Sequence, residues 1–106
     1  MKTFDAVLFF NDGFEEAEAI TPLDVLRRGG CEAVTVSLTG KKEVTGAHGV
    51  TVLADALYDE IFPDKPETQG IMMVLPGGPG TSGYKKHAAF LETLRRHHGA
   101  GGNFAA

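Results

Sequence analysis

The sequence contains one cysteine, no tryptophan and no apolar run long enough to cross a membrane as a helix. Cys31 alone cannot form an internal disulfide or a cysteine-based metal site, which favours a reducing, cytoplasmic location. Basic residues are also scarce, with 10 Lys and Arg against 14 Asp and Glu. Because nucleic-acid and anionic-membrane surfaces need a basic patch, the composition predicts neither kind of partner.

What remains is an ordinary globular composition in 106 residues, 42% of them hydrophobic, which fits one domain. Apolar runs predict strands that alternate with helical patterns. The predicted strands are 5–10, 32–38, 71–75 and the last few residues, and the predicted helices are 15–28 and 84–98. Between them we expect a small hairpin (43–46 and 49–54), a short helix (56–62) and a surface loop (63–70). This alternation predicts an α/β fold with a mainly parallel sheet.

The two predicted helices each carry one further expectation. Pro22 lies inside the first helix and predicts either one bent helix or two short ones. In the second helix, 84–98, we expect one buried stripe, formed by His87, Ala88, Leu91 and Leu94.

Segments 11–18 and 76–83 follow predicted strands, so in a parallel sheet they meet at the edge where ligands bind. Gly78–Gly83 matches the glycine spacing of dinucleotide-binding loops, but no acidic residue follows about 20 positions later. The glycines instead make a tight turn, or the backbone N–H groups of Gly77 and Gly78 face a developing oxyanion.

Acidic residues 15, 16 and 18 crowd the start of the first helix, where they complement the helix dipole. Alternatively, one of these carboxylates acts in the pocket as a proton donor or acceptor. Asn11, Asp12 and Asp55 resemble part of a phosphoacceptor cluster, but the lysine which that site requires has no counterpart after Lys86. We expect no metal site, because the histidines and carboxylates show no ligand spacing.

Several motifs, in order, resemble the ThiJ/PfpI superfamily, and most of all its DJ-one-like, Parkinsonism-associated deglycase branch. The resemblance starts in the predicted helix segment 14–30. This segment begins like the family's GFEE motif and ends like its DVLRR motif. It continues through 36–40, 44–50 and 53–55, and it includes the LPGG motif at 75–78. It covers essentially the whole chain.

The resemblance implies a flavodoxin-like sandwich of the class I glutamine-amidotransferase type, found as a homodimer. It also implies a cofactor-independent, cysteine-dependent glyoxalase or protein deglycase that acts on small aldehydes or glycated adducts in oxidative stress. By matching motif, Glu18 is the pocket glutamate, and Gly77 and Gly78 form the oxyanion side of the pocket. Substrate or subunit contacts are implied for Glu15, Asp12, Arg28 and His48.

Two departures from the family pattern matter. The loop after Gly78 is one residue shorter than usual. Ala105 and Ala106 match the residues just before the family's strained elbow, so the nucleophilic cysteine falls about two residues beyond position 106. Residues 1–106 are then a single domain that stops before its nucleophile, with the remainder missing or on a separate polypeptide. The alternative is a non-catalytic stress or chaperone-like holding protein on the same scaffold.

Overall fold

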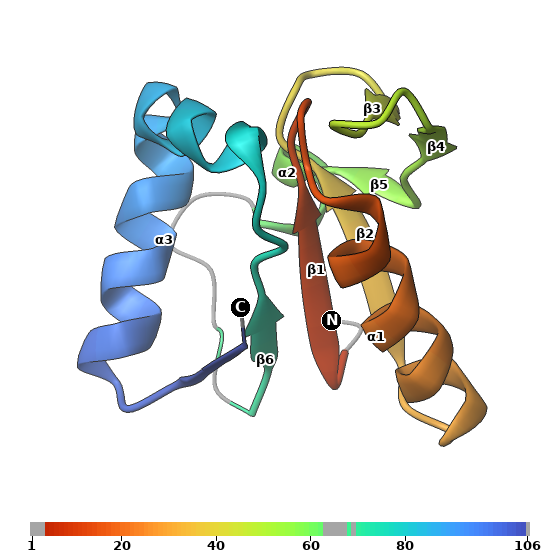
Figure 1. The fold of residues 1–106 in the computed structure, drawn as a ribbon. Helices are drawn as coiled ribbons and strands as arrows, with labels where there is room; N and C mark the ends of the chain where they lie inside the picture. The colour runs from red at the N-terminus through yellow and green to blue at the C-terminus, as the bar shows by residue number, and fades with distance from the viewer. Residues whose placement is uncertain (1–3, 63–67, 69, 106) are drawn as a thin grey trace.

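The computed structural model describes residues 4–62, 68 and 70–105, with only the backbone for 80–82. Figure 1 shows a sheet with helices on both sides. The strands are β1 (Ala6–Phe10), β2 (Ala33–Ser37), β3 (Glu43–Thr45), β4 (Thr51–Leu53), β5 (Ala56–Leu57), β6 (Met72–Val74) and β7 (Asn103–Ala105). The helices are α1 (Glu16–Arg28), α2 (Tyr58–Ile61) and α3 (Ala88–Gly99), with a 3-10 helix, η1 (Pro79–Lys86), before α3.

The main sheet has the order β5-β2-β1-β6-β7, and the pairings between its described strands are all parallel. β3 and β4 form a separate antiparallel hairpin. The predicted α/β class, the parallel sheet, the hairpin and the final strand are therefore confirmed. The chain leaves β1 towards β2 on one side and returns later to place β6 on the other. This reversal puts a topological switch point between the carboxyl ends of β1 and β6, where ligands bind in such sheets.

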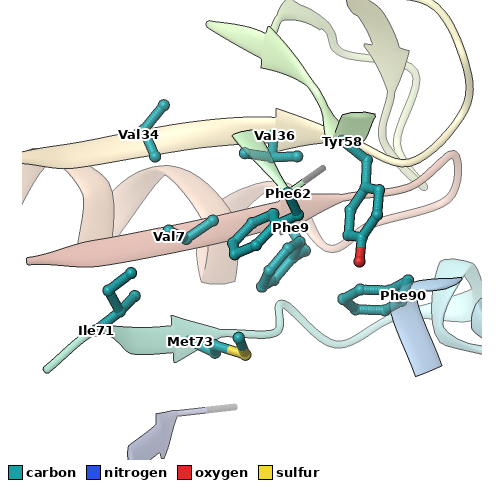
Figure 2. Close-up of a cluster of buried hydrophobic side chains, with 9 residues drawn as sticks. All are labelled: Val7, Phe9, Val34, Val36, Tyr58, Phe62, Ile71, Met73 and Phe90. Carbon is teal, nitrogen blue, oxygen red and sulfur yellow. The ribbon is translucent and has the colours of Figure 1, made fainter. Parts of the chain in front are cut away.

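β1 lies at the centre, and its residues are all buried, as its continuous apolar run predicts. Val7 and Phe9 point into one layer, where they meet Met73 of β6 and Phe90 of α3. Figure 2 shows Phe9 close to Phe62 and Phe90 in this layer. The ring centroids of Phe9 and Phe90 are 4.7 Å apart, so α3 is attached to the sheet largely through aromatic contacts.

The other face of the sheet is covered by α1 and the β3–β4 hairpin. Ala6, Leu8 and Phe10 of β1 pack here against Ala19 of α1 and Val44 of β3. The Phe10 ring stacks on Phe14, which lies just before α1, with centroids 5.0 Å apart. Because the start of α1 is fixed next to the end of β1, its first-turn carboxylates lie at the switch point.

α1 is one helix, continuous through Pro22, so of the two predicted forms the single helix is present and the pair of short helices is not. The predicted helix 84–98 is also corrected, because α3 begins at Ala88 and η1 occupies 79–86. The His87 side chain caps α3 by accepting a hydrogen bond from the Phe90 N–H at 3.1 Å. The glycine-rich loop thus leads into a 3-10 helix and not into an α-helix. A dinucleotide-binding fingerprint requires an α-helix directly after the loop, so the structure does not support that interpretation.

The buried stripe of α3 also differs from the predicted one. Phe90, Thr93 and His97 are its buried residues, while Ala88 is exposed and His87, Leu91 and Leu94 are only partly buried. Phe90, Thr93 and His97 follow the i, i+3, i+7 spacing of one helix face, and this face is the one turned towards the sheet. The predicted short helix at 56–62 is confirmed only in part, since Ala56 and Leu57 form β5 before α2 begins.

The predicted surface loop at 63–70 lies mostly outside the described residues. Among the helices that the structure describes, none is both long and apolar enough to span a membrane.

Candidate functional site

The segments that follow β1 and β6 meet at the switch point through one glycine. The Gly77 carbonyl accepts a hydrogen bond from the Glu15 N–H at 2.8 Å. The Gly77 N–H donates to Oε1 of Glu18 at 2.9 Å. The predicted convergence of segments 11–18 and 76–83 is therefore present here, and Glu18, Gly77 and Glu15 are in direct contact.

The two glycines are required by the closeness of this contact. A Cβ on Gly77 would lie 2.7 Å from Glu18 Oε1. Gly78 has a φ of 100°, and a Cβ there would lie 2.9 Å from both the Glu15 nitrogen and the Gly13 carbonyl oxygen. Any other residue at position 78 would adopt an unfavourable backbone conformation and would push the loop away from α1.

This arrangement defines what the site can do chemically. Glu18 is on the exposed side of α1, and its carboxylate is held over the end of β6 by the Gly77 N–H. A carboxylate in this position can exchange a proton with a bound group. The Gly77 N–H becomes available to a negative oxygen only when Glu18 releases it, so the two roles expected for Glu18 and Gly77 are coupled.

Glu15 and Glu16 have structural functions at the start of α1. Glu15 is the N-cap, and its carboxylate accepts a hydrogen bond from the Ala17 N–H at 3.1 Å. The Glu16 carboxylate reaches the hairpin, where it accepts from the backbone N–H groups of His48 at 2.8 Å and Val50 at 3.2 Å. It also meets the His48 Nδ1 at 3.0 Å. Glu16 thus fixes the β3–β4 turn to α1, a role that its place beside the other acids did not indicate.

These contacts shift two pKa values in opposite directions. Partial desolvation acts to raise the pKa of Glu16, but the hydrogen bonds from the His48 ring and from backbone N–H groups outweigh it and lower the pKa to about 2. The hydrogen bond to Glu16, with the charges of Glu16 and Glu15, raises the pKa of His48. His48 is accordingly a cation over a wider pH range than a free histidine.

Glu15, Glu16 and His48 also form a set of groups that could hold a metal ion, with one ligand atom from each lying within 4.8 Å of the others. The spacing argument missed this set because His48 comes 32 residues after Glu16. The Glu15 carboxylate already accepts a hydrogen bond from the Ala17 N–H of α1, and the Glu16 carboxylate is already bonded to His48 and Val50.

The other residues expected to contact substrate or a subunit are more dispersed. Asp12 Oδ1 accepts from the Thr45 N–H at 3.0 Å, so Asp12 ties the end of β1 to the hairpin. His48 is exposed over 72% of its side chain and lies beside Glu15 and Glu16. Arg28 is ten residues after Glu18 on α1, about 15 Å along the helix axis. It pairs with Asp24 at 2.9 Å, so the structure does not bring it to the Glu18 contact.

Cys31 lies just before β2, at the amino end of the sheet. It is half-buried, and it lines a hollow of about 610 Å³ with Arg27, Asp55 and neighbouring apolar residues. Asp55 itself accepts hydrogen bonds from the Arg27 side chain at 2.8 Å and the Thr35 N–H at 2.9 Å. It therefore joins α1 to β2, and the phosphoacceptor interpretation has no support at this position.

His97 is a buried polar residue whose role the sequence did not reveal. It is 1% exposed, its Nδ1 meets the Thr68 hydroxyl at 2.9 Å, and its Nε2–H donates to the Asn103 carbonyl at 2.9 Å. A Cβ on Gly102 would lie only 2.3 Å from the ring. His97 therefore holds β7, the strand at the open edge of the sheet, against α3. The adjacent histidines 97 and 98 gave no such signal.

The fold and the site define an α/β protein of the flavodoxin-like class, with a glutamate and two glycines at the switch point of its sheet. A family model, the DJ-1/PfpI family, matches residues 5–106. The chain belongs to the DJ-1/PfpI family.

Named relatives and solved structures agree with this membership. Protein dj-1beta of Drosophila melanogaster is 32% identical over 101 residues, which are 95% of this chain and 52% of that protein. A deglycase of Thermococcus kodakarensis is 42% identical over 67 residues, or 63% of this chain and 37% of that protein. The crystal structure of Drosophila DJ-1beta superposes with a TM-score of 0.83 at 29% identity, and covers 97% of this chain and 54% of that one. A DJ-1 superfamily protein from Salmonella typhimurium gives 0.82 at 30% identity, with coverage of 96% and 54%.

The chain therefore spans about half, or less, of the length of these relatives. These comparisons confirm the predicted family and fold.

Proposed function

We propose that this chain is the N-terminal part of a cofactor-independent, cysteine-dependent glyoxalase or protein deglycase that acts on small aldehydes or glycated adducts. The observation that carries the proposal is the Glu18 carboxylate bonded to the Gly77 N–H at the switch point, in a chain of the DJ-1/PfpI family. Relatives named deglycase in Thermococcus kodakarensis and Pyrococcus furiosus support the same reaction class.

In the proposed reaction, a thiolate adds to the aldehyde carbon and a hemithioacetal forms. The thiolate comes from an elbow cysteine beyond residue 106. Glu18 transfers a proton between substrate positions, and it releases the Gly77 N–H as the substrate oxygen becomes negative. Gly78 keeps this loop against α1, so the donor and the carboxylate stay at fixed positions. Cys31 takes no part, because it is at the opposite end of the sheet.

We also propose that the protein is a cytoplasmic homodimer that contributes to protection against oxidative stress. Exposed apolar side chains on the outer side of α1 and on the hairpin offer a surface for a second copy, namely Val25, Val50 and Leu53.

The first experiment is the intact mass of the natural polypeptide, followed by its consumption of methylglyoxal. We expect a species heavier than 11.3 kDa, or a second polypeptide that carries the elbow cysteine, and activity only when that cysteine is present. A sole species of 11.3 kDa would contradict a lost or separate C-terminal part. Turnover by residues 1–106 alone would contradict the proposed nucleophile, whether or not it survives Cys31→Ser.

The second experiment tests Glu18 in the active form. Glu18→Gln keeps the size and the acceptor oxygen but cannot transfer a proton as a carboxylate does, so we expect a loss of about 100-fold or more in kcat. Glu16→Gln is the matched control, since it removes an equal charge two residues away and has a hairpin contact instead. Equal losses of kcat in both variants would mean that Glu18 only complements the helix dipole and transfers no proton.

A holding function without catalysis is the second candidate, because the only cysteine in residues 1–106 is remote from Glu18. Suppression of the aggregation of a heat-denatured client by residues 1–106, unchanged in Glu18→Gln, would favour it.

A further inference from the structure

A second hollow lies at the carboxyl edge of the sheet, where β1 and β2 end against the junction of η1 and α3. It measures about 350 Å³, within the size range of small-ligand sites. Its lining includes Asn11, Asp12, Leu38, Thr39, Lys86 and His87. None of these residues takes part in the Glu18–Gly77 contact, so the hollow is a separate feature of the same edge.

His87 lines this hollow, and the contacts of its ring determine which nitrogen carries the proton. Its Nδ1 accepts the Phe90 N–H at 3.1 Å, so Nδ1 carries no proton in this geometry. The ring proton is then on Nε2, the nitrogen left to meet a ligand. The ring is also packed edge-on against Tyr58, with centroids 4.6 Å apart, which limits its rotation. The donor is therefore fixed by contacts on both sides of the ring.

The charged side chains around the hollow differ in whether they already have a partner. Among the contacts of the described residues, Lys86 has no carboxylate partner, and its side chain is exposed. Asp12 is the one acid in the lining, and its Oδ1 already accepts the Thr45 N–H. The amide of Asn11 lies against Gly83, where a Cβ would come within 2.4 Å of Nδ2. An ammonium, an imidazole N–H and an amide thus border one cavity.

We propose that this hollow binds a compact oxyanion, the phosphate or carboxylate group of a small metabolite. Lys86 supplies the positive charge and His87 Nε2–H supplies a directed hydrogen bond. Leu38 leaves one wall apolar, which suits a ligand with a short carbon skeleton. This site is independent of the proposed thiol chemistry and makes its own prediction for residues 1–106.

The test is an NMR titration of the 106-residue chain, in which backbone amide shifts are followed at constant ionic strength. Inorganic phosphate and succinate are the two probes, and sodium chloride is the reference. We expect saturable shifts at Asn11, Thr39 and His87 with at least one probe, and a shift of the His87 Nε2 resonance. The probe that binds more tightly identifies the oxyanion as phosphate or carboxylate.

Three variants make the test sharp. Lys86→Gln should weaken the binding about tenfold, as expected for the loss of one charge-assisted hydrogen bond. Lys85→Gln removes the same charge from the neighbouring residue, which does not line the hollow, and should leave the affinity within about twofold. Asp12→Asn should tighten the binding because it removes the opposing charge.

Absence of saturation up to 50 mM of either probe (roughly the weakest useful affinity) would overturn the proposal. Equal weakening by Lys86→Gln and Lys85→Gln would do so too, since it would mean diffuse attraction and no site. Amide spectra of each variant without probe confirm that the fold is retained before affinities are compared.

Discussion

The buried His97 provides the sharpest test of how the last strand is held. We consider His97→Leu, which keeps an apolar body of similar size but removes both ring nitrogens. The Thr68 hydroxyl and the Asn103 carbonyl would then lose their partners in a region that is 1% exposed at His97. An unsatisfied buried group costs about 1–3 kcal/mol. Because Asn103 is exposed and its carbonyl can bind water, we expect a loss of roughly 1–3 kcal/mol, mainly from the Thr68 hydroxyl.

A loss of this size is a large part of the roughly 5–15 kcal/mol that stabilises a typical domain. Urea unfolding followed by far-ultraviolet circular dichroism measures it, since the chain has no tryptophan. With a slope of about 1.5 kcal/mol per M, the midpoint should fall by roughly 0.7–2 M. His97→Gln, which can still donate and accept, should recover part of the loss.

His98→Leu is the matched control, because His98 is the adjacent residue and is exposed. We expect it to change the free energy of unfolding by less than about 0.5 kcal/mol. If His97→Leu were as stable as His98→Leu, the two hydrogen bonds would contribute nothing, and His97 would not hold β7 in place.

Three further outcomes are expected. Phe90→Ala removes a fully buried ring at the centre of the α3 layer and should cost about 3–5 kcal/mol by urea unfolding, so a loss below about 1 kcal/mol would refute its central place. Gly78→Ala should alter the amide signals of Glu15 and lower stability, because φ is 100° and the Cβ would come within 2.9 Å of the Glu15 nitrogen; an unchanged spectrum would contradict the required contact. The Glu16–His48 contact should be pH-dependent. The raised pKa of His48 gives stability that is full below about 6.5 and lost as pH rises through the folded value, whereas the lowered pKa of Glu16 gives stability that is full above about 4.5 and lost towards pH 2. The contact is then strongest between about pH 4.5 and 6.5, thermal unfolding against pH should show this, and Glu16→Gln should flatten the profile.

The central part of the fold could be predicted because its signal is local. The all-apolar run of β1 indicates a strand buried on both faces, and the Val- and Thr-rich run of β2 indicates its neighbour. Glycines after α1 and acids at its start mark the helix ends without any tertiary information. These features follow from backbone geometry and burial in a few consecutive residues.

Other parts depend on side-chain contacts that the local pattern rules do not describe, so the sequence did not reveal them. The start of α3 is set by the His87 ring, which acts as a cap, a role that pattern rules assign to Ser, Thr, Asp or Asn. The sequence did not distinguish Glu16 from Glu15 and Glu18, because the hairpin groups that Glu16 contacts are distant in the chain. Glu18 and Gly77 could be placed in one site only because both follow parallel strands, and the hydrogen bond between them needed the structure.

The order of the strands also has a consequence for synthesis on the ribosome. Ala6 of β1 pairs with Met72 of β6, a separation of 72 − 6 = 66 residues. At a translation rate of about 5–20 residues per second, one edge of the central strand stays without its neighbour for roughly 3–13 s. During that interval an apolar strand flanked on one side only is open to pairing with other chains. The nascent chain is therefore most vulnerable to misassembly before residue 74 has left the exit tunnel, and a chaperone that binds extended apolar segments would act there.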